Sequence, residues 1–248
     1  MHAVGKTDKG QTRKENQDAI FIENKPIGPL PNLYIVADGM GGHNAGEVAS
    51  EQAIDAIADY IRTFKAAAFV KPENFLDLLV TAVQYANKTV FTMSKETPEM
   101  KGMGTTLIAC TIHDGKIIMA HVGDSRAYVV TAENIKQITD DHTYVGQMLQ
   151  AGQISEAEAN AHPDRNIITR AVGSEESLQV DGIVRPINDT ITIVLCTDGL
   201  SDMMDNETIK NIVNGIGFAE QRTQFLIEEA NSLGGRDNIS AILIDVGR

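Results

Sequence analysis

The chain has 248 residues, 42% of them hydrophobic and 22% charged, and a formal net charge of −13 at pH 7. These proportions are those of an ordinary globular protein, and the length favours one compact unit of helices and strands over two domains. A negative charge of this size argues against nucleic acid or an anionic membrane as the partner, because their phosphate groups would be repelled.

Neither a targeting segment nor a disulfide framework is evident in the sequence. The start of the chain contains no apolar run of the signal-peptide kind, and no stretch approaches the roughly 20 apolar residues that a membrane span needs. Cys110 and Cys196 lie inside apolar runs without a second ligand at metal-like spacing, which predicts buried free thiols. We therefore expect a cytoplasmic protein that does not insert into a membrane.

The first part of the chain predicts three strands followed by two helices. Residues 3–5 and 19–23 flank a polar connection and are typical of strands, and residues 33–37 form a third, more apolar strand. Residues 44–64 and 72–91 carry apolar side chains at helical spacing. We expect these two helices to cover one face of a sheet.

From Gly104 the apolar pattern changes to that of strands. Residues 104–139 predict three or four strands joined as hairpins, with Asp114-Gly115 as a strong two-residue turn signal. The stretch 141–166 interrupts this pattern with two short helical pieces and is expected to be an excursion from the core. Two further strands, two helices and a last strand follow, at 177–187, 189–199, 205–213, 218–233 and 238–246.

The order of these elements predicts an α+β fold. Strands outnumber helices, and the helices come in one early and one late pair separated by the hairpins. A central sandwich of two mostly antiparallel β-sheets, flanked on each face by a pair of helices, buries all of these apolar faces. No repeat or linker divides the chain, so we expect a single domain over residues 1–248, in which the excursion at about 141–166 forms a small flap.

Four aspartates lie where strand-like runs turn into loops. Asp38 follows the run at 33–37 and precedes glycines, which allow the backbone to approach a bound group closely. Asp38 alone could simply begin a turn, but Asp124, Asp198 and Asp237 lie in similar settings. If these side chains converge, repulsion pushes them toward protonation unless divalent cations neutralise them.

All-oxygen ligation without a set of histidines and cysteines selects Mg²⁺ or Mn²⁺ over zinc. The residues fit two adjacent metals bridged by Asp38, with Asp198 and Asp237 on one metal and the Gly39 carbonyl on the other. A water bridging two cations about 3.5–4 Å apart is acidic enough to attack phosphorus near neutral pH, so we expect a phosphate monoester as substrate. Arg13, in a polar loop, is the natural partner for the phosphoryl oxygens.

Several of these candidates also have an ordinary structural interpretation. Arg13 could be a solvated loop charge, and Asp124 could pair with Arg126. Asp202 could cap the helix that follows it, and His43 could cap or pack at a helix start.

Eight segments follow one another along the chain: RKENQDA (13–19), ADGMGGH (37–43), GTT (104–106), GDSRAY (123–128), DH (141–142), ITRAVG (168–173), TDGLSD (197–202) and DNIS (237–240). In order and spacing they resemble the metal-dependent protein phosphatases, which are the PPM or type 2C serine/threonine phosphatases, and most of all the bacterial form. One segment alone would be a weak signal, whereas eight in register cover nearly the whole chain.

The resemblance implies the two-sheet fold and hydrolysis of phosphoserine and phosphothreonine in proteins with Mn²⁺ or Mg²⁺. The partners would be phosphoproteins, namely substrates of a bacterial serine/threonine kinase and the kinase itself, and we expect a monomer that acts in signal transduction. The resemblance also implies a role for each site residue. Asp38 would bridge two ions, Asp198 and Asp237 would complete the first, and the Gly39 carbonyl would bind the second. Asp18 would orient metal-bound water, Arg13 would bind phosphate, and Asp124 with Asp198 or Asp202 would hold a third, weaker ion.

Two positions depart from the eukaryotic pattern of this family. Met40 stands where those enzymes carry a histidine proposed as general acid, so His43 or a metal-bound water would have to protonate the leaving group. Gln17 replaces a glutamate that helps to hold water on the second metal, so a lower affinity is expected there.

Two other functions compete with an active phosphatase. One is a catalytically inactive member that binds phosphoproteins, but such a protein should have lost Asp38, Asp198 or Asp237, and all three are present. The other is a two-metal nuclease, which the acidity and the lack of a basic stripe in the sequence disfavour.

Overall fold

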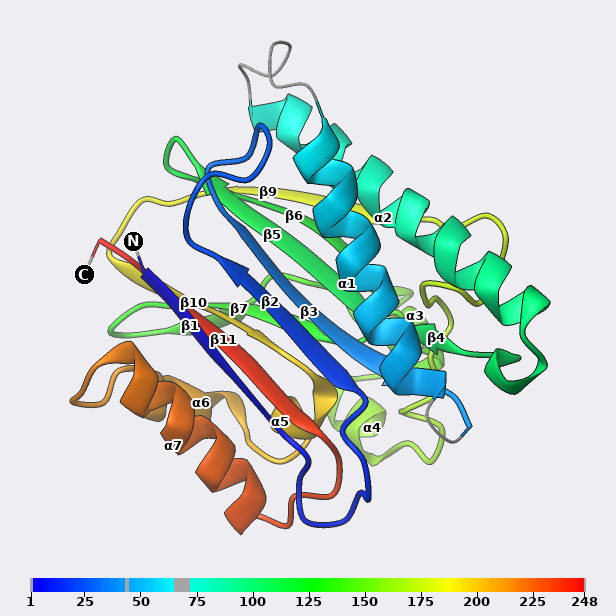
Figure 1. Ribbon diagram of the computed structural model, residues 1–248. Helices are drawn as coiled ribbons and strands as arrows, with labels where there is room; N and C mark the ends of the chain where they lie inside the picture. The colour runs from blue at the N-terminus through cyan, green and yellow to red at the C-terminus, as the bar shows by residue number, and fades with distance from the viewer. Residues whose placement is uncertain (1, 43–44, 65–71, 248) are drawn as a thin grey trace.

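The computed structural model describes residues 2–42, 45–64 and 72–247, and its centre is a pair of β-sheets packed face to face between two layers of helices (Figure 1). The five-stranded sheet contains, in spatial order, β1 (His2–Asp8), β11 (Ile239–Val246), β10 (Ile191–Cys196), β7 (Arg126–Val130) and β8 (Ile135–Gln137). The six-stranded sheet contains β2 (Asp18–Glu23), β3 (Leu33–Met40), β5 (Leu107–His113), β6 (Lys116–Val122) and β9 (Asp181–Pro186), and the short β4 (Gly104–Thr105) pairs with β3.

All of these strand pairs are antiparallel. The predicted turn joins β5 to β6 through Asp114 and Gly115, whose φ angles of 46° and 67° suit a tight hairpin. The first and last strands of the chain, β1 and β11, are neighbours in the five-stranded sheet.

Apolar side chains of the strands divide between two layers of the core. In β11, Ile242 points into the space between the sheets, whereas Leu243 packs under the helices on the outer face. Because both faces of the central strands are covered, these strands are continuous apolar runs instead of alternating ones. Cys110 and Cys196 lie in two such strands as buried free thiols, as the sequence predicts.

Two pairs of helices cover the outer faces of the sandwich (Figure 1). α1 (Ala45–Thr63) and α2 (Pro72–Glu96) lie on the six-stranded sheet, and α6 (Asn206–Val213) and α7 (Ala219–Ser232) lie on the five-stranded sheet. Each presents an apolar stripe inward, such as Ile57 and Ile61 of α1. The predicted α+β sandwich is confirmed. None of the described helices is long and apolar enough to cross a membrane.

The stretch 141–166 forms two short helices between β8 and β9, as predicted. α3 (Tyr144–Gln150) begins after Thr143, whose side chain accepts the Gly146 amide at 2.9 Å. α4 (Glu156–Ala161) begins after Ser155, which forms a capping box with Glu158. These caps stabilise helices that are too short to form by propensity alone.

Two element boundaries differ from the sequence prediction at the candidate site. β3 does not end before Asp38 but continues through it, because Gly39 and Met40 pair with β4, which follows the single turn η2 (Pro98–Met100). Asp38 is therefore a strand residue, and its interpretation as the start of a turn is wrong. Asp198 is the first residue of a one-turn helix, α5 (Asp198–Ser201), that the sequence pattern did not predict.

Candidate active site

Asp18 and Asp38 lie opposite each other on β2 and β3 as a registered pair. Asp18 is buried, and its Oδ2 accepts hydrogen bonds from Thr197 Oγ1 at 2.8 Å and from Ser240 Oγ at 2.7 Å. Ser240 belongs to β11 and Thr197 follows β10, so both donors come from the other sheet. Asp18 thereby joins the two sheets where the other carboxylates gather.

Burial and mutual repulsion raise the pKa values of four carboxyl groups. The pKa of Asp38 lies well above its ordinary value, first because the group is buried and then because Asp18, Asp198, Asp124 and Asp237 repel its charge. Burial, with repulsion from neighbouring aspartates, raises the pKa of Asp18 to about 7, that of Asp124 to about 8 and that of Asp198 to about 6. The fold therefore brings five aspartates from distant segments within electrostatic reach of one another.

This cluster has the donor chemistry of a site for hard cations. Asp18 Oδ1 and Asp198 Oδ1 are buried and have no hydrogen-bond partner among the described residues, a costly arrangement unless a proton or a cation balances it. Carboxylate and carbonyl oxygens are the ligands that Mg²⁺ and Mn²⁺ prefer. No group of three or more acidic, histidine or cysteine side chains in the described residues is already close enough to hold an ion. The residues thus fit divalent cations by the chemistry of their oxygen donors.

Asp237 is engaged by the residue that the sequence predicts as the phosphate ligand. Arg13 Nη2 donates to Asp237 Oδ2 at 2.6 Å, and the other oxygen, Oδ1, accepts the Asn238 amide at 2.8 Å. About half of the Arg13 side chain remains exposed. Arg13 therefore reaches the carboxylate cluster from the loop between β1 and β2.

That loop is held in place by residues whose role the sequence analysis missed. Asn238 Oδ1 accepts the Gln17 amide at 2.8 Å, and its Nδ2 donates to the carbonyls of Lys9 and Glu15, each at 2.9 Å. Ser50 Oγ of α1 donates to the Gln17 carbonyl at 2.7 Å. The only signal in the sequence is position, since Asn238, Thr197 and Ser240 are short polar residues beside the aspartates in TDG and DNIS.

Gly39 occupies a space that admits no side chain. A Cβ atom there would lie 2.0 Å from the Gly46 carbonyl oxygen and 2.6 Å from that of Gln17. The Gly39 amide donates to the Gln17 carbonyl at 3.0 Å. The glycine after Asp38 is therefore required by the close packing of β3 against α1 and the loop before β2.

Asp124 lies buried in the turn between β6 and β7. The ion pair of Arg126 is formed with Asp141, at 2.6 Å between Nη2 and Oδ2, and not with Asp124. The structural alternative for Asp124, pairing with Arg126, is therefore wrong, although the Arg126 charge still lowers the Asp124 pKa slightly against the larger effect of burial. The Asp124 carboxylate therefore has no ion pair with Arg126 that would compete with the proposed metal ion.

Asp202 lies at the end of α5, and its backbone amide donates to the Asp198 carbonyl at 2.7 Å. It does not cap the next helix, because Asp205 does so by accepting the Thr208 amide at 2.8 Å. Arg165, from the loop after α4, lies 3.8 Å from the Asp202 carboxylate. Asp202 thus faces both the carboxylate cluster, where its charge raises the pKa of Asp198, and the flap.

The predicted general acid, His43, lies outside the described residues. Met40 is the last residue of β3, and Gln17 is held through its backbone as described above. The structure brings the carboxylates and Arg13 together, while their ligand roles and the acid role of His43 stay predictions.

Comparison with known proteins agrees with this geometry. The protein phosphatase 2C family model matches residues 8–243. The serine/threonine phosphatase stp of Listeria welshimeri is 37% identical over 247 residues, which cover 99% of this chain and 96% of that protein.

Solved structures give the same result. The serine/threonine phosphatase Stp1 from Staphylococcus aureus has a TM-score of 0.91 and 32% identity, over 99% of this chain and 95% of that one. The catalytic domain of the phosphatase PstP in complex with two manganese ions has a TM-score of 0.82 and 31% identity, over 98% of this chain and 97% of that one.

The fold and these relatives place the chain in the class of phosphoprotein phosphatases. The chain belongs to the protein phosphatase 2C family, as the eight sequence segments predict.

Proposed function

We propose that this protein hydrolyses phosphoserine and phosphothreonine in proteins with a binuclear Mn²⁺ or Mg²⁺ centre. The observation that carries the proposal is the convergence of Asp18, Asp124, Asp198 and Asp237 around Asp38, where their charges raise the pKa of Asp38. Asp18 and Asp198 each have a buried oxygen without a partner among the described residues. The serine/threonine assignment is supported by the names of relatives that match nearly the whole chain. An inactive family member has no support from these comparisons.

We propose a ligand role for each carboxylate, as the family resemblance implies. Asp38 would be shared by two ions, Asp198 and Asp237 would complete the first, and the Gly39 carbonyl would bind the second. Two such cations supply a water that is acidic enough to attack phosphorus near neutral pH. A third ion would be held by Asp124 with Asp198 or Asp202.

Asp18 would orient the attacking water. Its Oδ2 is occupied by Thr197 and Ser240, so its position is fixed from the opposite sheet and its unpartnered Oδ1 remains as the acceptor. A carboxylate fixed in this way can hold a water molecule at one orientation, which favours in-line attack.

Arg13 would bind the phosphoryl oxygens. The bond to Asp237 uses one of the N–H groups of a guanidinium that carries five, and the exposed half of the side chain is open to a substrate. His43, or water, would protonate the serine or threonine leaving group, because Met40 cannot.

The test is hydrolysis of p-nitrophenyl phosphate by the purified chain with Mn²⁺, with Mg²⁺ and with EDTA. We expect turnover that needs a divalent cation and stops with EDTA, and faster release of phosphate from phosphoserine and phosphothreonine peptides than from phosphotyrosine peptides. Turnover that persists in EDTA, or no turnover with either metal, would reject the metallophosphatase. Turnover confined to phosphotyrosine would reject only the serine/threonine assignment.

The setting of this activity is also a proposal. We propose a cytoplasmic monomer, one domain over residues 1–248, that opposes a serine/threonine kinase by acting on the kinase and its substrates. Light scattering of the purified chain tests the oligomeric state, and a dimer at micromolar concentration would contradict it.

A further inference from the structure

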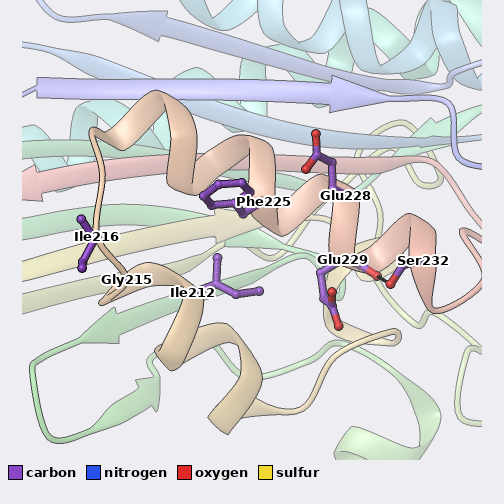
Figure 2. Close-up of a pocket in the computed structure, with 7 residues that line it drawn as sticks. All are labelled: Ile212, Gly215, Ile216, Phe225, Glu228, Glu229 and Ser232. Atoms are coloured by element: carbon purple, nitrogen blue, oxygen red, sulfur yellow. Dashed lines mark hydrogen bonds between the residues drawn. The ribbon is translucent and has the colours of Figure 1, made fainter.

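A groove lies between α6 and α7 on the outer face of the five-stranded sheet, where the proposed phosphatase chemistry makes no use of it (Figure 2). Its volume is about 430 Å³. We name it the α6–α7 groove, and the residues that line it are Ile212, Gly215, Ile216, Phe225, Glu228, Glu229 and Ser232.

Large apolar side chains at this groove are left in solvent. Ile216 is fully exposed at 101% and Phe225 at 49%, and Phe218, two residues after Ile216 in the chain, is exposed at 79%. Phe225 lies outside the inward stripe of α7 that contains Leu226 and Ile227, so the sheet does not cover it. A cluster of exposed apolar side chains on one surface is typical of an interaction site.

The walls of the groove are fixed by buried polar contacts. Arg222 of α7 donates to the Val213 carbonyl at the end of α6 at 2.9 Å and forms an ion pair with Asp245 of β11. The turn after α6 is held at Asn214, whose Nδ2 donates to the Thr131 carbonyl at 2.7 Å. The groove is therefore present before any partner binds, which lowers the entropic cost of binding.

The charged residues that line the α6–α7 groove are all negative. Glu228 and Glu229 are the only charged residues among the seven that line it, and both lie on α7 one turn beyond Phe225 (Figure 2). A second groove on the outer face of α2, lined by Tyr85, Lys88, Thr89, Thr92, Met93, Glu96 and Thr97, carries both signs and so does not select a charge. The acidic edge of the α6–α7 groove and the net charge of −13 repel anionic lipid surfaces and favour a cationic partner.

We propose that the α6–α7 groove is a docking site for a cationic amphipathic segment of a partner protein. One or two large apolar side chains of the segment pack on Ile216 and Phe225, and adjacent lysine or arginine side chains reach Glu228 and Glu229. A groove of this size supports a weak, transient contact. The proposal is independent of the catalytic assignment, because binding needs no metal and no phosphate.

The test is fluorescence polarisation in EDTA with a labelled synthetic helix that has leucine on one face and lysine on the other. We expect saturable binding that weakens about tenfold or more in Phe225→Ala and in the double variant Glu228→Lys/Glu229→Lys. Ile216→Ser should weaken binding as well. Its side chain is fully exposed, so it can be replaced without disturbing the fold. Tyr85→Ala, at the same 49% exposure on α2, and the double variant Glu96→Lys/Glu99→Lys are the matched controls and should bind like the wild type.

Four results of the binding assay would overturn the proposal, as would the dimer or vesicle result given after them. They are absence of saturable binding, equal binding of the same helix with glutamate in place of lysine, equal losses in the control variants, and unchanged binding in all groove variants. A dimer that Ile216→Ser dissociates would assign the groove to a second copy of the chain, and binding of phosphatidylcholine vesicles that Ile216→Ser abolishes would assign it to lipid. Circular dichroism of each variant excludes unfolding as the cause of a loss.

Discussion

Arg13 and Asp237, 224 residues apart in the chain, form an ion pair with an Nη2–Oδ2 distance of 2.6 Å. The pair joins the loop after β1 to the loop before β11, so the proposed phosphate ligand lies directly beside a proposed metal ligand. Asp237 occupies one N–H group of the guanidinium, so the proposed phosphate contact would use the others. In this arrangement one side chain would position both the phosphoryl group and Asp237.

Arg13→Ala tests the phosphate role. We expect the inhibition constant of inorganic phosphate to rise about tenfold or more, and KM for p-nitrophenyl phosphate to rise with it, because charge-assisted hydrogen bonds to the phosphoryl group are lost. The free energy of unfolding should change by less than about 1 kcal/mol, since the pair is half exposed. Arg13→Lys keeps the charge without the two-pronged geometry and should give an intermediate constant. Phosphate inhibition that is the same in all three proteins would make Arg13 a structural residue only.

Asp38→Asn tests the bridging role. We expect kcat with Mn²⁺ to fall about a thousandfold or more, because the amide adds no negative charge between two cations. In EDTA the variant should be at least as stable as the wild type, since burial and four neighbouring carboxylates already disfavour the ionised side chain. Steady-state kinetics and urea unfolding measure the two effects. Wild-type turnover in the variant would show that Asp38 is not a ligand of the proposed metal centre.

Gly39→Ala tests the close packing at the end of β3. The added Cβ would lie 2.0 Å from the Gly46 carbonyl oxygen, so β3 and α1 must separate. We expect a loss of about 3 kcal/mol in the free energy of unfolding. Gly42→Ala is the matched control, because a Cβ at Gly42 meets no atom of the described residues within 4 Å, and it should change stability by less than about 1 kcal/mol. If the two substitutions changed the free energy of unfolding equally, α1 would be able to move away from β3 without loss of stability.

His121 makes stability depend on pH. Its ring is fully buried and lies 4.6 Å from the ring of His142, and burial, followed by the His142 charge, lowers the His121 pKa to about 3. The unfolded chain takes up a proton near the ordinary pKa of 6.5, whereas the folded chain does not until about 3, so this group makes the protein less stable as the pH falls below 6.5. The expected loss between pH 6.5 and 5 is about 2 kcal/mol.

The measurement compares wild type with His121→Leu by urea unfolding at several pH values in EDTA. Neither ring nitrogen of His121 forms a well-aligned hydrogen bond with the described residues, although the Ser125 backbone lies close enough to raise the His121 pKa against the larger effect of burial. Groups that do not interact with His121 titrate in both proteins and cancel in the difference, whereas His142 and Asp181 contribute to it. The advantage of the variant should grow as the pH falls, and a difference that does not change with pH would contradict the assignment.

Much of the fold could be predicted from the sequence because its determinants are local. Helical spacing of apolar residues in α1 and α2, the Asp114-Gly115 turn and the capped helices of the flap all depend on neighbours in sequence. The carboxylates at 38, 198 and 237 could be predicted as a group because each follows or precedes an apolar strand. The extension of β3 through Asp38 could not, since it depends on pairing with β4, more than sixty residues later.

The polar residues that support the site could not be predicted because their partners are remote. Thr197 and Ser240 reach Asp18 across 179 and 222 residues, and Asn238 holds a loop more than 220 residues earlier. Nothing in the local pattern distinguishes such residues from solvent-exposed threonine, serine or asparagine. The same holds for Arg126, which pairs with Asp141 instead of Asp124, although Asp124 is nearer in the sequence.

The pairing of β1 with β11 also has a consequence for folding. β11 is the strand that β1 and β10 both need as a neighbour, and its Ser240 is one of the two residues that hold Asp18. Because the contacts of Asp18 join segments 179 and 222 residues apart, closing them carries a large entropic cost. We expect the helices and hairpins to form first, and the carboxylates to come together only when β11 enters the sheet.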